Sequence, residues 1–196
     1  MTSTRSWLAV PVAAVLLAGC GLQSIPQAEN AVAAAWAETE NQYQRRADLV
    51  PNLVETVKAY AAHERETLEA VVAARAKATQ VTFTADQLNV ENLKKFEAAQ
   101  KELGSALGRL LAVSENYPQL KASENFRDLQ AQLEGTENRI ATARRRYIEQ
   151  VQGFNDLVTV PPTSWTNGLM YHKQPKPQFT ATTANAAEAP KVNFGK

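Results

Sequence analysis

Mostly apolar residues recur in this chain at alternating spacings of three and four, and this period constrains its fold more than any other feature. One run lies at Leu93, Phe96, Gln100, Leu103, Leu107, Leu110, Ser114 and Tyr117. A longer run lies at Phe126, Leu129, Leu133, Thr136, Ile140, Ala143, Tyr147, Val151, Phe154 and Val158. Side chains at these spacings line one face of an α-helix. The pattern predicts two long helices, with Leu103 and Leu107 pointing inward.

Two further amphipathic stretches precede these runs and flank Pro51. The first has Val32, Trp36, Tyr43 and Val50 on its apolar face. The second has Leu53, Val57, Tyr60, Glu64, Leu68, Val71 and Arg75. Proline suits the first turn of a helix, so Pro51 could open a second helix with Asp48 as its cap. A kink in one continuous helix is the alternative.

Local signals predict the ends of the later helices. Thr84, followed three residues later by Gln87, resembles a capping box that opens the third helix. Pro118 is predicted to end that helix, and Ser123 or Asn125 to begin the fourth.

Four amphipathic segments joined by short connections predict an all-α fold, an antiparallel four-helix bundle over residues 28–158. Beyond Thr159 the composition changes, because five of the nine prolines lie there and Thr, Asn and Ala replace Leu. Residues 159–196 are therefore predicted to be an extended or disordered, Pro/Thr/Ala-rich C-terminal tail. Its first part, from Val160 to Phe179, is apolar enough to lie along the bundle.

The N-terminal segment has the pattern of a targeting signal. An apolar run from Trp7 to Ala18 follows Arg5. A run of about twelve residues is too short to span a bilayer, which takes about twenty. A cationic start, a short apolar stretch and small residues before a cleavage point are typical of a secretory signal peptide.

The end of this segment, Leu-Ala-Gly-Cys, resembles the bacterial lipobox. The only cysteine of the chain, Cys20, stands where that motif requires it. We therefore predict a lipoprotein signal peptide over residues 1–19, cleavage between Gly19 and Cys20, lipidation of Cys20, and a short tether over residues 20–27. A free buried thiol behind an ordinary signal peptide is the alternative.

The charge balance limits the partners that the chain can bind. Lys and Arg number 21 and Asp and Glu number 20, so the formal net charge is +1. No excess of positive charge is available for nucleic acid or for an anionic membrane surface. The lipid alone would hold the protein at its membrane, and Gly21 in place of an aspartate favours the outer membrane, on its periplasmic face.

Reactive groups are too few and too scattered to predict an enzyme. A di-iron centre in a bundle needs Glu-x-x-His on two facing helices, and the sequence has no such pair. His63 and Glu64 could supply single ligands, but we favour an ion pair of Glu64 with Arg75 or Arg139. No nucleophile motif or glycine-rich phosphate loop is present, so no catalytic residue, metal or cofactor is predicted.

Two clusters of arginines are the strongest charge features. They are Arg45 with Arg46, and the triplet at residues 144–146. Successive helical residues project about 100° apart, so the triplet cannot face one partner. A solvated face with pairs such as Arg145 and Glu149 is the favoured interpretation, and an anion or partner contact is the other.

Two stretches of the sequence resemble a known family. Residues 41–75, NQYQRRADLVPNLVETVKAYAAHERETLEAVVAAR, look like the signature of the LemA family of bacterial envelope proteins, and residues 114–147 resemble its second signature. The resemblance implies a four-helix bundle and brings no established enzymatic activity. Candidate interaction residues in the first stretch are Arg45, Arg46, Asp48, Asn52, Glu55, His63 and Glu64.

The chain departs from the family pattern at both ends. Many relatives are held by an N-terminal transmembrane helix, whereas this chain carries the lipobox. The closing segment of the family is only loosely matched at residues 154–157, so we expect the tail to be specific to this lineage.

Three functions are compatible with these patterns. The favoured hypothesis is a non-enzymatic, lipid-anchored scaffold or adaptor for a membrane or periplasmic protein, with a membrane protease as one possible partner. The alternative is a binding module for a small anionic ligand, such as a lipid headgroup or cell-wall fragment, in the bundle interior or near Arg45 and Arg46. The third is a metal-dependent enzyme that uses His63 and Glu64.

Overall fold

The computed structural model describes residues 23–179, and the elements formed there are helical, as the sequence predicts. The predicted signal peptide, Gly19 and Cys20 lie outside the described residues, as do residues 180–196 of the tail. The elements are α2 (Ser24–Tyr60), α3 (Arg65–Gln80), α4 (Val90–Val113), η1 (Ser114–Asn116), α5 (Pro118–Ala122), α6 (Glu124–Thr159), α7 (Thr163–Thr166) and η2 (Asn167–Tyr171).

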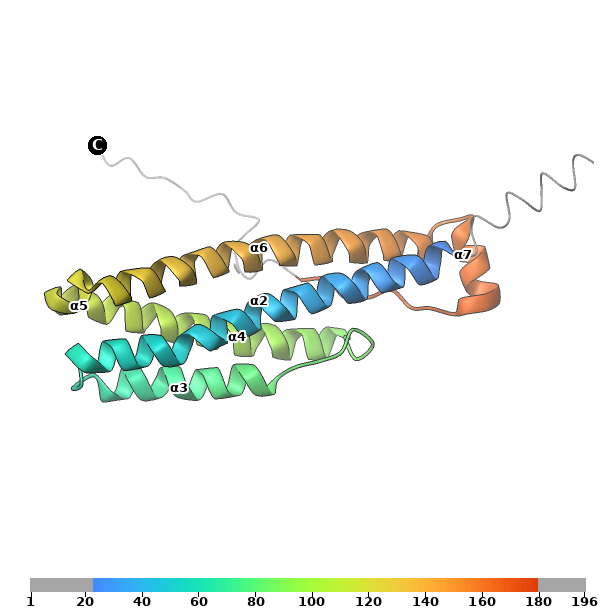
Figure 1. The fold of residues 1–196 in the computed structure, drawn as a ribbon. Helices are drawn as coiled ribbons and strands as arrows, with labels where there is room; N and C mark the ends of the chain where they lie inside the picture. The colour runs from blue at the N-terminus through green and yellow to red at the C-terminus, as the bar shows by residue number, and fades with distance from the viewer. Residues whose placement is uncertain (1–22, 180–196) are drawn as a thin grey trace, which may run out of the picture.

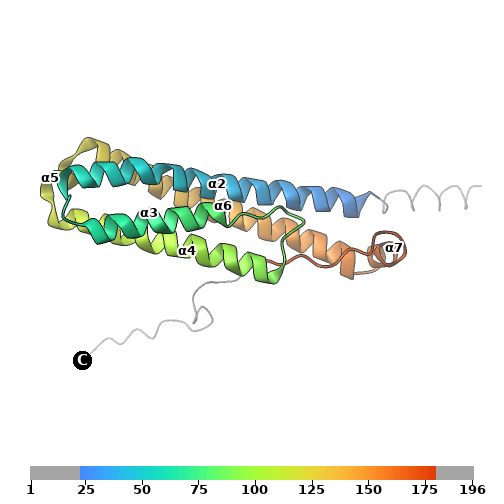
Figure 2. The ribbon, with the colours of Figure 1, turned by 90° about the horizontal axis from the view of Figure 1, so that it is seen from below.

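Two long antiparallel helices, α2 and α6, form the backbone of the molecule (Figure 1). Helices α3 and α4 pack beside them and stop short of the end where α2 begins (Figures 1 and 2). We call that end, with Ser24, Thr159 and α7, the proximal end. The opposite end, with Tyr60 and α5, is the distal end. No helix in residues 23–179 is long and apolar enough to cross a membrane.

Helix α2 passes through Pro51 without a break, so the continuous-helix alternative is the correct one. Asp48 caps no helix, and its Oδ1 accepts a hydrogen bond from Gln44 Nε2 at 2.7 Å. The predicted helix through Arg75 is wrong, because the chain turns at residues 61–64. No Gly or Pro marks this turn. It forms because Leu68 must fold back into the apolar cluster that the end of α2 occupies.

The predicted start and end of the third helix are also wrong. The Gln87 side chain accepts a hydrogen bond from the Thr84 backbone N–H at 3.1 Å, but this closes only a local turn. Helix α4 starts at Val90, capped by Asn89, whose side chain accepts from the N–H of the third helical residue. It ends at residue 113, and Pro118 instead opens the short α5.

The start of α6 agrees with the sequence, and the tail does not wholly agree. Ser123, one of the two predicted starts, occupies the N-cap position of α6. Residues 163–171 are helical rather than extended or disordered. Residues 172–179, which we call the strap, lie along the bundle and bury Phe179.

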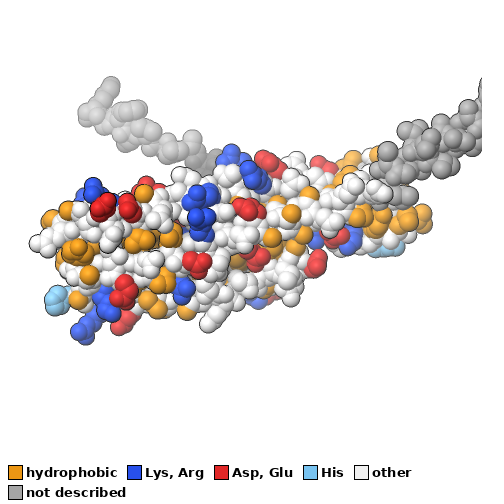
Figure 3. Space-filling view, in the orientation of Figure 1, with side chains coloured by type: hydrophobic (Ala, Val, Ile, Leu, Met, Phe, Trp, Pro, Cys, Tyr) orange, Lys and Arg blue, Asp and Glu red, His pale blue; other side chains and the backbone are white. Residues whose placement is uncertain are grey.

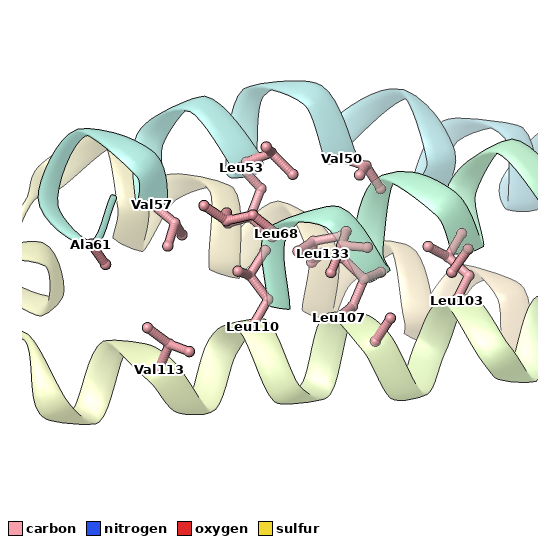
Figure 4. Close-up of a cluster of buried hydrophobic side chains, with 14 of the residues drawn as sticks. Val50, Leu53, Val57, Ala61, Leu68, Leu103, Leu107, Leu110, Val113 and Leu133 are labelled. Atoms are coloured by element: carbon pink, nitrogen blue, oxygen red, sulfur yellow. The ribbon is translucent and has the colours of Figure 1, made fainter. Parts of the chain in front are cut away.

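Two apolar clusters make up the core. The distal cluster is built mainly from Leu, Val and Ala of α2, α3 and α4, and also contains Leu120 of α5 and Phe126 and Leu133 of α6 (Figure 4). Leu103 and Leu107 belong to it and are 0% and 5% exposed, as their spacing predicts. The proximal cluster is rich in rings, among them Trp36 and Phe96, and it closes over Phe179 of the strap. A polar layer, formed by Arg46, Gln100 and Glu137, lies between the two clusters.

Candidate functional site

Arg46 is the centre of the polar layer, and its burial is unusual for an arginine. It projects from α2 and is 4% exposed. Its Nη1 donates to Glu137 Oε1 on α6 at 2.9 Å. Its Nη2 donates to the backbone oxygen and the Oε1 of Gln100 on α4, at 2.9 and 2.7 Å. One guanidinium therefore ties three helices together.

The polar layer borders an open groove between α2, α4 and α6, with a volume of about 500 Å³. Arg46 Nε is buried there and has no hydrogen-bond partner. The guanidinium also lies 5.0 Å from the centre of the Tyr43 ring, a cation–π contact. Burial raises the pKa of the Tyr43 hydroxyl, although Arg144 and Arg46 partly offset the shift. The groove is lined by Tyr43, Arg46, Glu97, Gln100, Lys101, Gly104, Ser105, Glu137, Ile140 and Arg144.

A second arginine connects this groove with the strap. Arg144 Nη2 donates to Glu97 Oε1 at 3.0 Å, and its guanidinium lies 4.3 Å from the centre of the Phe179 ring. Burial raises the pKa of the Glu97 carboxyl, because the cost of desolvating its charge outweighs the attraction of Arg144. The solvated interpretation of the arginine triplet is therefore wrong for Arg144, while Arg145 and Arg146 are exposed.

Side-chain amides and an ion pair fix the strap on the proximal end. Asn155 donates to the Lys176 carbonyl and accepts from the Lys176 N–H, at 2.9 and 2.8 Å. The Tyr147 hydroxyl donates to Pro177 O at 3.0 Å. Lys173 Nζ lies 2.8 Å from Glu29 Oε2 near the start of α2. These contacts hold the strap to α2 and α6.

A second groove, the distal groove, lies between α2 and α3 and has a volume of about 780 Å³. Its floor is mostly apolar and contains Leu68. Val72 is 52% exposed at its edge, which is high for a valine on a packed helix. The groove is lined by Val54, Glu55, Lys58, Ala62, Arg65, Leu68, Glu69, Val72, Ala73 and Ala76. Charges of both signs therefore border an apolar surface.

The seven predicted interaction residues do not form one site. Arg46 lies in the polar layer and Glu55 in the distal groove, while Arg45, Asp48, Asn52 and His63 are exposed elsewhere. Glu64 pairs with neither Arg75 nor Arg139, because its carboxylate accepts from the Tyr117 hydroxyl at 3.1 Å. Arg75 instead donates from Nε to Ala47 O at 2.8 Å.

Sequence reasoning missed most partners of Arg46 and Arg144. Gln100 gave a signal, because it is a polar residue in an otherwise apolar run, and such residues are hydrogen-bonded when buried. Glu97, Glu137 and Phe179 gave none, since their contacts come from other helices or from the strap. Within residues 23–179, no three His, Cys, Asp or Glu side chains gather closely enough to hold a metal ion.

Comparison with known proteins identifies the class to which this helical fold belongs. The sequence model of the LemA family matches residues 35–194. The chain is therefore a member of the LemA family. Because the match reaches residue 194, the expectation of a lineage-specific tail is wrong.

Part of the sequence is similar to two magnetosome proteins. Over 72 residues the chain is 33% identical to magnetosome protein MamQ 2 of Paramagnetospirillum magneticum, which covers 37% of this chain and 26% of that protein. Over 69 residues it is 30% identical to magnetosome protein MamQ of Magnetospirillum gryphiswaldense, covering 35% of this chain and 25% of that protein. The matched region spans about a quarter of the length of these relatives.

Proposed function

We propose that this LemA-family protein is a non-enzymatic, lipid-anchored protein of the bacterial envelope that acts as an adaptor for a membrane or periplasmic protein. The distal groove is the observation that carries the proposal. It is an apolar surface between two helices at the end of the molecule away from the N-terminal tether. The MamQ relatives share too little of their length to lend their named role to this chain.

The anchor in this proposal is the lipid on Cys20, and the location is the periplasmic face of the outer membrane. Cys20→Ser is expected to abolish acylation and to move processed protein into the soluble periplasmic fraction. Processed protein that stays membrane-bound after this change would contradict the lipid as the only anchor.

The occupant that we propose for the distal groove is an amphipathic helix of the partner. Its apolar stripe would cover Leu68 and Val72, because helices bury such stripes in grooves between two helices. Both rims carry charges of each sign, Glu55 with Lys58 and Arg65 with Glu69, which suits a helix whose flanks also carry both signs. A membrane protease is one candidate class of partner for the distal groove.

The experiment is affinity purification of the full chain from detergent-solubilised membranes. A stoichiometric protein partner is expected with the wild type and is expected to be lost with Val72→Glu, because a charge would be buried against the partner. Val90→Glu is the matched control, since Val90 is 59% exposed and lies outside the distal groove. Equal partner recovery from all three proteins would contradict the proposal.

A second candidate function, capture of a small anion, is favoured by one observation at the polar layer. Arg46 Nε is buried without a partner beside a groove lined by three cationic and two acidic side chains. Calorimetric titration of the full chain with glycerol phosphate tests it. Saturable heat that Arg46→Met removes would favour the ligand-binding function. Heat that is equal in both proteins, or absent, would reject it.

A further inference from the structure

Exposed apolar side chains gather on one short segment at the proximal end. Trp165, Leu169, Met170 and Val160 are 71%, 80%, 56% and 53% exposed. They are four of the seven large hydrophobic side chains in residues 23–179 that stand out as exposed. Figure 3 shows hydrophobic side chains gathered at this end of the molecule. An apolar patch of this kind marks an interaction surface.

The backbone beneath these side chains is firmly held. Asn167 is 7% exposed and its Nδ2 donates to Val158 O and to Lys173 O, at 3.3 and 3.0 Å. Its Oδ1 accepts from the Lys173 N–H at 2.9 Å. The segment is thus clamped from inside while Trp165 and Leu169, four residues apart, are presented outward.

The position of the patch indicates what covers it. Lys173, which follows η2, is bound to Glu29 in the second turn of α2, so α7 and η2 lie beside the start of that helix. Only four residue steps separate Ser24 from Cys20, and fully extended they reach about 14 Å. A lipid on Cys20 therefore keeps the bilayer surface within reach of the patch.

We propose that α7 and η2 form a membrane-docking surface, in which Trp165, Leu169 and Met170 insert into the interfacial region of the bilayer. This inference rests on the proposed lipid anchor. Tryptophan favours the level of the lipid headgroups, and apolar side chains on an interfacial segment sink about 5–10 Å into the boundary with the acyl chains. The neighbouring Lys173 and His172 are polar groups at the edge of the inserted surface. Docking here orients the bundle, so that the distal groove lies about 45 Å away along α2.

The test uses the tryptophans of the mature protein, purified with its lipid on Cys20 and reconstituted into vesicles of phosphatidylethanolamine and phosphatidylglycerol with brominated acyl chains. Trp7 is removed with the signal peptide, so the anchored protein has two tryptophans. Trp36 is 1% exposed and serves as an internal reference, whereas Trp165 is open to its surroundings. Bromolipid is expected to quench the Trp165 emission and to leave the Trp36 emission unchanged. The change Trp165→Phe is expected to remove all quenching.

Two further variants test whether the quenching of Trp165 depends on the apolar side chains of this surface. Leu169→Ser together with Met170→Ser is expected to lower the quenching of Trp165, because the segment then inserts less deeply. Val72→Ser, at an apolar position of the distal groove that is 52% exposed, is the control and is expected to leave the quenching unchanged.

Vesicle flotation separates this inference from the proposed anchor. Protein that floats without quenching of Trp165 would overturn the docking surface and leave the anchor intact, and protein that does not float would overturn both. A blue-shifted Trp165 emission that needs no lipid and grows with protein concentration would also overturn the inference, because a second copy of the chain would then cover the patch.

Discussion

The two ends of the bundle are filled in different ways. At the distal end four helices meet, and Leu, Val and Ala fill most of the space between them, with Phe126 as the one ring among the buried residues of the distal cluster. At the proximal end α3 and α4 cover less of the long helices, and rings take up the volume that a helix would fill. Trp36 lies 5.1, 5.5 and 6.1 Å from the ring centres of Phe96, Tyr147 and Phe179. A few large side chains and a strap thus replace a helical layer.

The comparison explains why the polar layer lies where it does. Arg46 and its partners lie between the distal and proximal clusters, where α2, α4 and α6 still meet. A buried, hydrogen-bonded arginine fixes the register of these helices, because sliding by one turn would leave its charge unpaired. The two ends are therefore packed with different side chains, and Arg46 helps to align the helices that run through both.

The largest effect is expected from Trp36→Ala. Removing this ring takes away the centre of the proximal cluster and the hydrogen bond from Nε1 to Phe83 O at 2.7 Å. The expected loss is about 3–5 kcal/mol in the free energy of unfolding, measured by urea denaturation. Trp36→Phe is the control that keeps a ring, and a loss as large as that of Trp36→Ala would show that the hydrogen bond matters more than the packing.

A comparable test of the distal cluster is Leu103→Ala, with Leu107→Ala as a second site. Both side chains are buried, so each truncation is expected to cost about 2–5 kcal/mol. Unchanged denaturation midpoints for both variants would contradict the packing of Leu103 and Leu107 in the distal cluster.

A smaller and more local effect is expected from Asn167→Ala. The change removes the three hydrogen bonds that clamp η2 to the end of α6 and to the strap. We expect a loss of about 1–3 kcal/mol and faster amide exchange in the strap, with exchange around Leu103 unchanged. Equal acceleration at both ends would show that they do not open separately.

The smallest expected effect is a loss of folding stability at acidic pH. Burial tends to raise the pKa of the Glu29 carboxyl, but Lys173 and Lys176 outweigh it and hold the pKa below its ordinary value of 4.5. A lowered pKa in the folded state contributes stability above 4.5 that is lost as the pH falls through the folded value.

This linkage is tested by measuring the midpoint of thermal unfolding between about pH 6 and pH 3. Wild-type protein is expected to lose stability on acidification slightly more than Glu29→Gln, which has no carboxyl to protonate. Parallel curves for the two proteins would contradict a role for this ion pair at the proximal end.

The sequence predicted the parts of the fold that depend on periodicity. The apolar runs identified the buried faces of α4 and α6, including Leu103 and Phe154, because helical spacing is a local property. The turn after Tyr60 was missed, since no residue there favours a turn and the reason for it is tertiary. The strap was only partly foreseen, because its order comes from Asn155 and Asn167, whose side chains bind backbone atoms of the strap.

The sites were harder to predict than the fold. Arg46 was singled out by its charge, but its burial follows from the helices that converge on it, and the sequence gives no hint of Glu137 as its partner. Val72 drew no attention as a surface residue. The expectation that the apolar segment from Val160 to Phe179 lies along the bundle is wrong for Trp165, which is exposed, since an apolar residue in a sequence does not reveal whether it is covered.

We propose that the two ends have different partners, lipid at the proximal end and protein at the distal end. Photo-crosslinking in living cells tests it most directly, with a photoreactive amino acid placed at position 165 or at position 72 of the full chain. We expect lipid adducts from position 165 and one discrete protein adduct from position 72. Protein adducts at position 165 together with lipid adducts at position 72 would contradict it.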